Sequence, residues 1–233
     1  MGRVIKEVSE MKPMTEQHLA TLRRHMVEVI EIQAELMTEE LGKEQLDARV
    51  LDAMRRVPRH RFVPGQLAAL AYHDTPLPIG FDKTISQPFI CALMLDLLAI
   101  DRSESVLEVG TGLGYLTAIL AELGAQVWSV EIVEEFAGEA IQRLSACGYG
   151  NVTVRVGDGS RGWTEHAPFD KIVVSAAARQ PPEALLNQLK AGGRMVAPIG
   201  PNEVQQLTVI DKTAGGEVKT RAVIPVRFSQ LEM

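Results

Sequence analysis

The sequence has little cysteine and no long apolar run. Its two cysteines, Cys91 and Cys147, lie far apart, and neither belongs to a C-x-x-C pair. Both stand in apolar stretches of helical character, so we expect buried, reduced thiols and a cytoplasmic protein rather than a disulfide framework. No apolar run reaches the roughly 18 residues of a membrane-spanning helix, and Met1–Glu10 lack the apolar core of a signal peptide.

A basic excess is also missing. The chain has 24 Lys and Arg against 30 Asp and Glu, which gives a formal net charge of -6 and a pI near 5.5. Nucleic-acid-binding surfaces usually carry a positive excess, so we expect neither nucleic acid nor a membrane as a partner. What the chain does have is 46% hydrophobic residues, which is enough to build a sizeable core.

The N-terminal third is predicted to be helical. Apolar residues recur at helical spacing from Thr15 to Met37, Gly42 interrupts them, and a second helix is predicted from Lys43 to about Arg56. The proline-rich stretch that follows, up to Pro88, keeps too many apolar residues for a linker and reads as an ordered, functional loop region. Residues 1–87 would thus form a helical region and a substrate and cofactor loop. The role of residues 1–40, as a lid or a dimer contact, and the choice between monomer and homodimer stay open.

From residue 88 the chain alternates between helical and strand-like segments. This alternation predicts an α/β fold with a doubly wound, mostly parallel sheet, and the last two strands predict an antiparallel hairpin at one edge. Residues 88–233 would form this domain, in one compact unit with the region before it. The expected strands are 105–109, 126–131, 152–156, 171–175, 194–198, 206–211 and 218–228, and the expected helices are 88–99, 114–123, 134–146 and 182–190.

A glycine-rich loop follows the first of these strands. Residues 105–115 read SVLEVGTGLGY, which places Gly110, Gly112 and Gly114 between a strand and a helix. Glycines there let the backbone turn tightly and approach a ligand, and the helix directs its free N–H groups to the same point. The G-x-G-x-G spacing, with Glu108 before it, resembles the first motif of Rossmann-like S-adenosylmethionine-dependent methyltransferases. That resemblance implies that Glu108 and Thr111 belong to the cofactor site, with Glu108 near the amino end of the ligand.

Two more elements follow the next two strands. Glu131 ends the second strand, where a carboxylate accepts hydrogen bonds from ribose hydroxyls in dinucleotide and methyl-donor sites alike. Gly157, Asp158 and Gly159 follow the third strand, and the Asp158 carboxylate can accept a bond from an adenine amino group. The glycines could serve only as turns. Three such elements at one carboxyl edge nevertheless favour a ligand site.

The loop before residue 88 is the most specific part of the sequence. Residues 71–80 read AYHDTPLPIG and residues 84–88 read TISQP. With these runs the chain resembles the protein-L-isoaspartate O-methyltransferase family over about residues 47–230. The family usually has G-x-G-Q before the TIS run, whereas this chain has Asp82 and Lys83 in place of the second glycine and the glutamine. Further matches are 57–64 (VPRHRFVP), 157–159, 162–163, 169–177, 182–193 and 225–228.

The resemblance implies an enzyme of protein repair. It would methylate the carboxylate of L-isoaspartyl residues in damaged proteins and peptides with S-adenosylmethionine and release S-adenosylhomocysteine. A carboxylic acid with a pKa of ~4 is already ionised at neutral pH, so the nucleophile needs no general base. The protein has to align the reactants and exclude water. We therefore expect no catalytic triad, no metal cluster and no paired carboxylates.

Ser86 is the predicted catalytic residue, since the resemblance implies that its hydroxyl donates a hydrogen bond to one substrate oxygen. Ser86 could also cap the helix that begins near Pro88. By the same resemblance, Thr84 and Ile85 shape the loop around the methionine end of the cofactor, and Ser86 belongs to that site as well. Asp74 either orients this loop or is a turn residue.

The resemblance also implies a substrate-binding strand. Val226, Arg227 and Phe228 match the terminal strand of the family, whose backbone pairs with the substrate peptide. Backbone pairing would tolerate many peptide sequences, because side chains then contribute little to recognition.

Three other functions stay open at this point. The changed residues Asp82 and Lys83 could serve a different peptide or small-molecule acceptor, with Lys83 attracting an anion and Asp82 repelling it. A cofactor-binding protein without catalysis is disfavoured by the intact TIS run and the intact glycine loop. An NAD-linked oxidoreductase is disfavoured by the G-x-G-x-G spacing.

Overall fold

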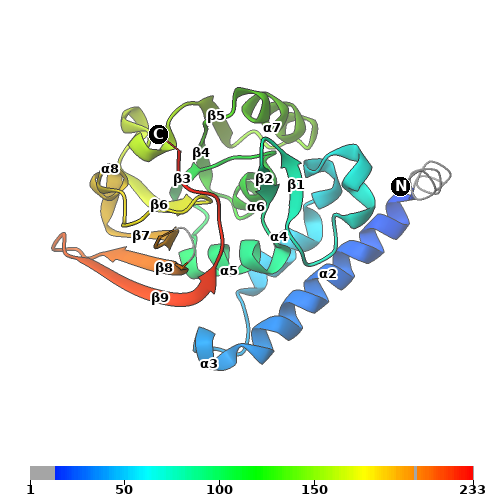
Figure 1. Ribbon diagram of the computed structural model, residues 1–233, viewed down its shortest axis with the longest axis horizontal. Helices are drawn as coiled ribbons and strands as arrows, with labels where there is room; N and C mark the ends of the chain where they lie inside the picture. The colour runs from blue at the N-terminus through cyan, green and yellow to red at the C-terminus, as the bar shows by residue number, and fades with distance from the viewer. Residues whose placement is uncertain (1–13, 202–203, 233) are drawn as a thin grey trace.

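The computed structural model describes residues 14–201 and 204–232. Met1–Glu10, and the expectation stated for them, lie outside this part of the chain. A central sheet is flanked by helices, and the long helix α2 runs diagonally along the outside (Figure 1). None of the helices in the described ranges is long and apolar enough to cross a membrane.

Seven strands form the central sheet in the order β5-β4-β3-β6-β7-β8-β9. The first five strands in this order are parallel to one another, β8 is antiparallel to β7, and β9 is antiparallel to β8. This confirms the predicted doubly wound, mostly parallel sheet with an antiparallel hairpin at one edge. The chain moves outward from β3 to β5 and then returns to β6 on the other side of β3. The strands are β3 (Ser105–Val109), β4 (Gln126–Glu131), β5 (Val152–Val156), β6 (Phe169–Val174), β7 (Leu189–Ile199), β8 (Gln205–Lys212) and β9 (Val218–Val226).

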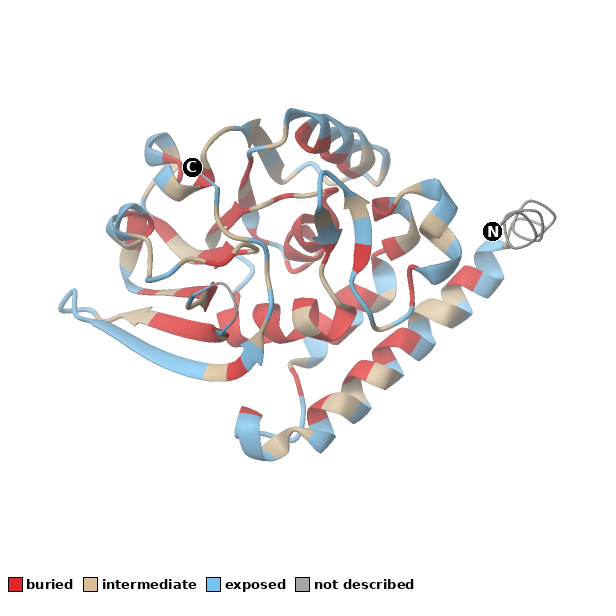
Figure 2. Cartoon of the chain, in the orientation of Figure 1, coloured by how far each residue is buried: buried red, intermediate tan, exposed pale blue. Residues whose placement is uncertain are grey.

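Successive residues of the parallel strands pack on opposite faces of the sheet. In β3, Val106 joins the cluster on one face, while Leu107 and Val109 join the cluster on the other. The first cluster includes side chains of α2, α4, α5, α6 and α7, and the second includes side chains of α8. Figure 2 shows the buried residues gathered on the sheet and on the inner sides of the helices. The helices are α2 (Glu16–Leu36), α3 (Thr38–Leu41), α4 (Ala48–Arg56), α5 (Pro88–Leu98), α6 (Tyr115–Glu122), α7 (Glu134–Ala146) and α8 (Glu183–Gln188).

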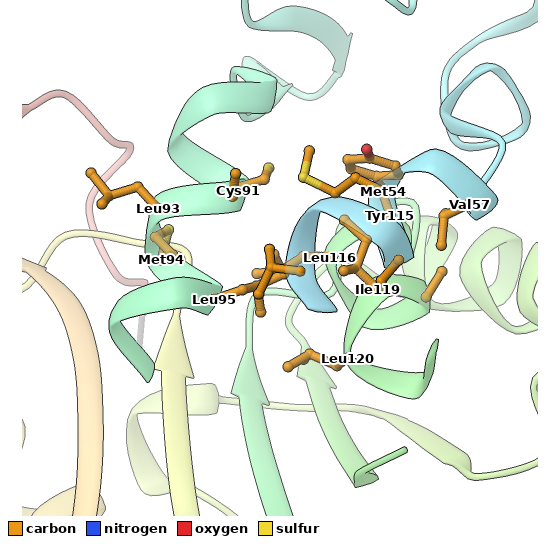
Figure 3. Close-up of a cluster of buried hydrophobic side chains, with 14 of the residues drawn as sticks. Met54, Val57, Cys91, Leu93, Met94, Leu95, Tyr115, Leu116, Ile119 and Leu120 are labelled. Carbon is orange, nitrogen blue, oxygen red and sulfur yellow. The ribbon is translucent and has the colours of Figure 1, made fainter. Parts of the chain in front are cut away.

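The N-terminal helices pack into the same core as the sheet. The first cluster contains buried side chains from both sides of residue 88, among them Met54, Leu95 and Ile119. Figure 3 shows these three side chains, which come from α4, α5 and α6, within that cluster. Of the two cysteines, Cys91 is buried in α5 as expected, but Cys147 is only partly buried at the end of α7. Both are free thiols.

The second predicted helix begins later than its apolar pattern indicated. Helix α4 starts at Ala48, because the Asp47 carboxylate accepts the Arg49 N–H at 2.8 Å and caps it there. The short helix α3 precedes it and ends at Gly42 in the left-handed conformation.

The proline-rich region is also more regular than a loop. It contains two 3-10 turns and a small antiparallel hairpin. These elements are η1 (Arg59–Phe62), η2 (Gly65–Leu70), β1 (Leu77–Gly80) and β2 (Lys83–Ile85).

A buried carboxylate ties the segment before α4 to the core. Asp96 of α5 accepts hydrogen bonds from Lys43 Nζ at 2.6 Å and from the Asp47 N–H at 2.7 Å, and its side chain is almost fully buried. Both donors precede α4 in the sequence, and both bond to Asp96 of α5. The Asp96 side chain therefore fixes where α4 begins relative to the sheet.

Asp96→Ala should therefore destabilise the fold. The substitution leaves a partly buried N–H without its acceptor and breaks a half-buried ion pair, so we expect the free energy of unfolding to fall by about 2 kcal/mol. Urea unfolding at neutral pH measures it. Asp52→Ala is the matched control, because Asp52 forms an exposed ion pair with Arg55, and its loss should cost under about 1 kcal/mol. Equal losses in the two variants would contradict this role of Asp96.

Candidate active site

A cavity of about 940 Å³ lies at the carboxyl edge of the parallel strands. Its wall includes the glycine loop after β3, the end of β4, the loop before α5 and the last described residues of the chain. From β3 the chain continues to β4 on one side of β3 and later returns to β6 on the other side. The cavity therefore lies at the topological switch point, where open α/β sheets bind ligands. Of the predicted site residues, the wall contains Thr84, Ile85, Ser86, Gly110, Thr111, Gly112, Glu131, Gly159, Val226, Arg227 and Phe228.

Glu131 holds the glycine loop in place. One oxygen of its carboxylate accepts the Gly112 N–H at 2.7 Å, and the other accepts the Val133 N–H at 3.0 Å. Gly112 has a φ of 55°, a conformation that side chains with a Cβ rarely adopt, and so the loop follows the cavity wall with bare backbone. Glu131 is buried to 6% exposure and still lines the cavity.

Glu108 lies behind this wall. The alternation along β3 turns its side chain toward α6, where one oxygen accepts hydrogen bonds from Thr117 and Ser129, each at 2.6 Å. Ser129 in turn bonds to Thr111 of the glycine loop at 2.6 Å. The other oxygen, Oε1, is buried without a partner among the described residues. Burial raises the pKa of Glu108 to about 7, and the nearby Glu131 charge adds to the shift.

Asp158 is engaged in its own turn. Its carboxylate accepts the Ser160 N–H at 2.9 Å and the Ser160 hydroxyl at 2.6 Å, and it pairs with Arg161 at 3.0 Å. The hydrogen bonds from Ser160 hold the pKa of Asp158 below its usual range. These bonds cap the turn η3 (Gly159–Arg161), which places Gly159 in the cavity wall. Gly114, Gly157 and Asp158 themselves lie outside the wall, as does Glu108.

Asp74 positions the loop that carries Ser86. It accepts the backbone N–H of Phe89 at 2.8 Å in the first turn of α5, and the side chains of Gln87 and Gln33, each at 2.7 Å. Asp74 thus caps α5, which Ser86 does not, and it joins the loop to α2. The Ser86 hydroxyl has no hydrogen-bond partner within residues 14–201 and 204–232, and Ser86 is half-buried in the cavity wall.

The Asp82–Lys83 change lies at a tight turn in the cavity wall. Phe81 and Asp82 connect β1 and β2 with φ values of 49° and 56°, so the aspartate adopts the left-handed conformation that favours glycine. Lys83 forms an ion pair with Glu232, which lies 149 positions further along the chain. Both partners line the cavity, and their pairing joins the hairpin to the C-terminal segment.

The C-terminal segment runs across the carboxyl edge of the sheet. Ala177, which follows β6, exchanges backbone hydrogen bonds with Ser229 and Leu231 at 2.8 Å each. Upstream, the side chain of Gln205 accepts the Phe228 N–H at 2.7 Å and donates to the Phe228 carbonyl at 3.0 Å. The backbone of Phe228 is therefore already occupied. The backbone N–H and C=O of the exposed Arg227 have no partner in the part of the chain that the structure describes.

Comparison with known proteins identifies the family. Residues 31–232 match the family model "Protein-L-isoaspartate(D-aspartate) O-methyltransferase (PCMT)". The chain belongs to this family of methyltransferases. A protein-L-isoaspartate O-methyltransferase 1 of Polaromonas sp. is 53% identical over 219 residues, which are 94% of this chain and 93% of the relative. A protein-L-isoaspartate O-methyltransferase of Gloeobacter violaceus is 50% identical and covers 84% of this chain and 96% of its own.

Solved structures of the same name share the fold. One protein-L-isoaspartate O-methyltransferase superposes with a TM-score of 0.73 at 26% identity, and it covers 87% of this chain, which spans 66% of that one. A Plasmodium falciparum protein of this type, solved with S-adenosyl-L-homocysteine, has a TM-score of 0.74 at 23% identity over 90% of this chain and 98% of its own.

Arg59 and Tyr115 are two residues at or next to the cavity of this methyltransferase that the predicted site did not include. Arg59 is fully buried and donates to the Ser86 carbonyl, and Tyr115 lines the cavity. Arg59 stands in the proline-flanked VPRHRFVP run, in which basic and apolar residues are mixed, and this run was the available signal. The histidine of the AYHDTPLPIG run, His73, is exposed and lies outside the cavity wall. Within the described ranges, no group of three His, Cys, Asp or Glu side chains could hold a metal ion.

Glu108 should make the stability of this methyltransferase fall as pH rises. The pKa of Glu108 is about 7 in the folded protein, against an ordinary value of 4.5, so the folded state keeps a proton that the unfolded state has lost. The contribution of Glu108 to the free energy of unfolding therefore decreases as the pH rises from the ordinary pKa to the raised one, and it does not return at higher pH.

The Glu108→Gln variant has no such titration. Its free energy of unfolding, relative to the wild type, should rise with pH over the same interval and level off above it, by up to about 3 kcal/mol. Urea unfolding at several pH values measures this difference, with Glu44→Gln as an exposed control on the surface. A difference that does not change with pH would show that Glu108 is ionised throughout.

Proposed function

We propose that this chain transfers a methyl group from S-adenosylmethionine to the carboxylate of L-isoaspartyl residues in proteins and peptides, and so acts in protein repair. The observation that carries the proposal is one cavity lined both by the glycine loop after β3 and by the Ser86 loop before α5. It occurs in a chain that belongs to the protein-L-isoaspartate(D-aspartate) O-methyltransferase family.

The residues of the cavity suit this cofactor. Its volume of about 940 Å³ falls in the range of small-molecule sites. Each oxygen of Glu131 accepts one backbone N–H and keeps a second lone pair, which can accept a ribose hydroxyl. Around it, Thr84, Ile85, Ser86, Gly110, Thr111, Gly112 and Gly159 would form the contact surface.

Four other residues support that surface from behind. Glu108 acts on the glycine loop through Ser129 and Thr111. Gly114 begins α6 with a φ of 94°, and a Cβ there would lie 3.3 Å from Leu144. Gly157 and Asp158 set the turn that brings Gly159 to the wall.

The reaction asks for alignment rather than for proton transfer. When bound, S-adenosylmethionine supplies a methyl group that is activated by a positively charged sulfur. An acceptor carboxylate with a pKa of ~4 is ionised at neutral pH, so no side chain has to act as a base. The Ser86 hydroxyl, which has no partner among the described residues, can donate to one oxygen of the acceptor and leave the other free to attack.

Arg227 is the best candidate for holding the acceptor peptide. Its backbone N–H and C=O have no partner among the described residues, and it lines the cavity directly after the edge strand β9. An extended peptide can pair with these two groups as a short added strand. Val226 would contribute to the same edge, while Phe228 would act through its side chain, since Gln205 occupies its backbone.

Ser86→Ala should reduce methyl transfer without loss of cofactor binding. Removal of one donor that stabilises the reacting oxygens typically costs roughly 100-fold to 1,000-fold in rate. The assay counts base-labile methyl ester formed from methyl-labelled S-adenosylmethionine on two matched peptides, one with L-isoaspartate and one with L-aspartate. We expect the wild type to label only the isoaspartyl peptide.

Ser145→Ala, on the exposed face of α7, is the matched control and should keep full activity. Labelling of neither peptide by a wild type that binds the cofactor would overturn the isoaspartyl acceptor. An unchanged rate in Ser86→Ala would remove Ser86 from the catalytic step.

A different dedicated acceptor is the second candidate, and the Asp82–Lys83 turn is the observation that favours it. Both side chains line the cavity, where they add one negative and one positive charge. The positive charge is matched by Glu232, however, and Asp82 is exposed. The pairing leaves Lys83 little preference for an anionic acceptor of its own, and we therefore favour the isoaspartyl acceptor over a new one.

Glu232→Gln should release Lys83 and lower the KM for an isoaspartyl peptide. An exposed ion pair is worth under about 1 kcal/mol, so we expect a decrease of about threefold at low salt that disappears at high salt. Steady-state kinetics at two ionic strengths measures it. Glu217→Gln, whose partner Lys219 lies on the edge hairpin outside the cavity wall, is the control. A decrease that persists at high salt would mean that Glu232 acts by shape and not by charge.

A further inference from the structure

Arg59 is a cation buried beside the Ser86 loop. Its side chain is fully buried in η1, although arginine is rarely found without access to water. Its Nε donates to the Ala71 carbonyl at 2.9 Å, and its Nη2 donates to the Ser86 carbonyl at 2.7 Å. The guanidinium thereby joins the segment before the hairpin to the residue that carries the free hydroxyl.

No carboxylate among the described residues forms an ion pair with this charge. Arg59 forms no ion pair with any acidic residue in the described ranges, and its Nη1 is buried without a hydrogen-bond partner there. The guanidinium carbon lies 4.6 Å from the centroid of the Tyr115 ring, so an aromatic face and two carbonyl oxygens are its main compensation. A buried charge without a counter-ion is costly, so this position favours an anion that the described residues do not supply.

The surroundings of Arg59 place it directly behind the cavity. Ser86, Cys91 and Tyr115 all line the cavity, and each of the three contacts or interacts electrostatically with the guanidinium. Figure 3 shows Cys91 on α5 and Tyr115 on α6, both at the top of the apolar cluster. Arg59 itself is not part of the wall, so it can act on an acceptor only through Ser86 and through its electric field.

We propose that Arg59 is a positioning residue with two effects on the acceptor. Its bond to the Ser86 carbonyl fixes the backbone from which the Ser86 hydroxyl reaches the cavity. Its uncompensated positive charge favours a carboxylate, over a neutral group of the same shape, at the place where Ser86 donates. This inference rests on the proposed function, because it takes the bound acceptor carboxylate as the missing counter-ion.

Lysine reproduces only half of this arrangement. A guanidinium offers several donors in a planar fork, and two of them here reach carbonyls on different segments, whereas a lysine places a single charge at the end of a flexible chain. Arg59→Lys should therefore keep most of the preference for an anion and lose alignment of Ser86. Arg59→Gln should lose both.

The experiment compares binding of two peptides that differ in one group. One carries L-isoaspartate, with its free carboxylate, and the other carries the isosteric carboxamide at the same position. Each is titrated calorimetrically into the protein saturated with S-adenosylhomocysteine, in the wild type, Arg59→Gln, Arg59→Lys and Cys91→Asp. The last variant keeps Arg59 and adds a carboxylate beside it, and so neutralises the charge should Arg59→Gln fail to fold.

We expect the wild type to bind the carboxylate peptide about tenfold more tightly than the carboxamide peptide. This ratio should fall close to one in Arg59→Gln and in Cys91→Asp, while the Kd of S-adenosylhomocysteine changes little. In Arg59→Lys the ratio should stay near that of the wild type, and kcat should fall with little change in KM.

The opposing outcomes are distinct. If affinity for both peptides falls equally in the variants, Arg59 has only a structural role and the inference is overturned. If the wild type binds both peptides equally, no charge preference exists, and the inference fails even where methylation of the isoaspartyl peptide succeeds. If the wild type methylates no isoaspartyl peptide at all, the proposed function fails first and the inference with it.

Discussion

The central position of β3, parallel to both β4 and β6, is the constraint on which the site depends. Because the three carboxyl ends meet at one edge, the glycine loop, Glu131 and the segment after β6 converge on one cavity. The segment after β6 then holds the end of the chain through Ala177, and so places that end in the cavity wall. A change in the register of β3 would therefore displace every wall of the cavity together.

Much of the fold could be predicted from local patterns. The bounds of β3, β4 and β5 match the predicted ones, because each strand is a short valine-rich run that turn residues bound. The start of α4 could not be predicted, since it depends on Asp96, which lies 49 positions from the backbone N–H that it accepts. The hairpin β1–β2 was hidden because prolines and a left-handed aspartate lie where a turn usually shows glycine.

The sequence indicated which residues form the site better than it indicated which hydrogen bonds and ion pairs hold them in place. Glycines and carboxylates at strand ends indicate a ligand by their spacing alone, and many of them line the cavity. Their partners are remote in sequence: Asp74 joins Gln33 to Phe89, and Lys83 meets Glu232. Pairing over such separations is a property of the tertiary fold. No local pattern therefore indicates whether Glu108 faces the ligand or the helix behind it.

The free edge of β9 has a consequence for which damaged residues can be reached. Most of this edge is protected against pairing with a second sheet. Lys219 and Arg221 are exposed along it, and Pro225 cannot donate a backbone hydrogen bond. At Arg227, at the cavity, both the backbone N–H and the C=O lack a partner among the described residues. If the proposed function holds, a substrate protein must present its isoaspartyl residue in a short extended segment that is not part of a helix or strand. Altered residues inside intact helices of a substrate protein would then not be repaired until those helices open. The rate of local unfolding of the substrate protein would limit the rate of repair.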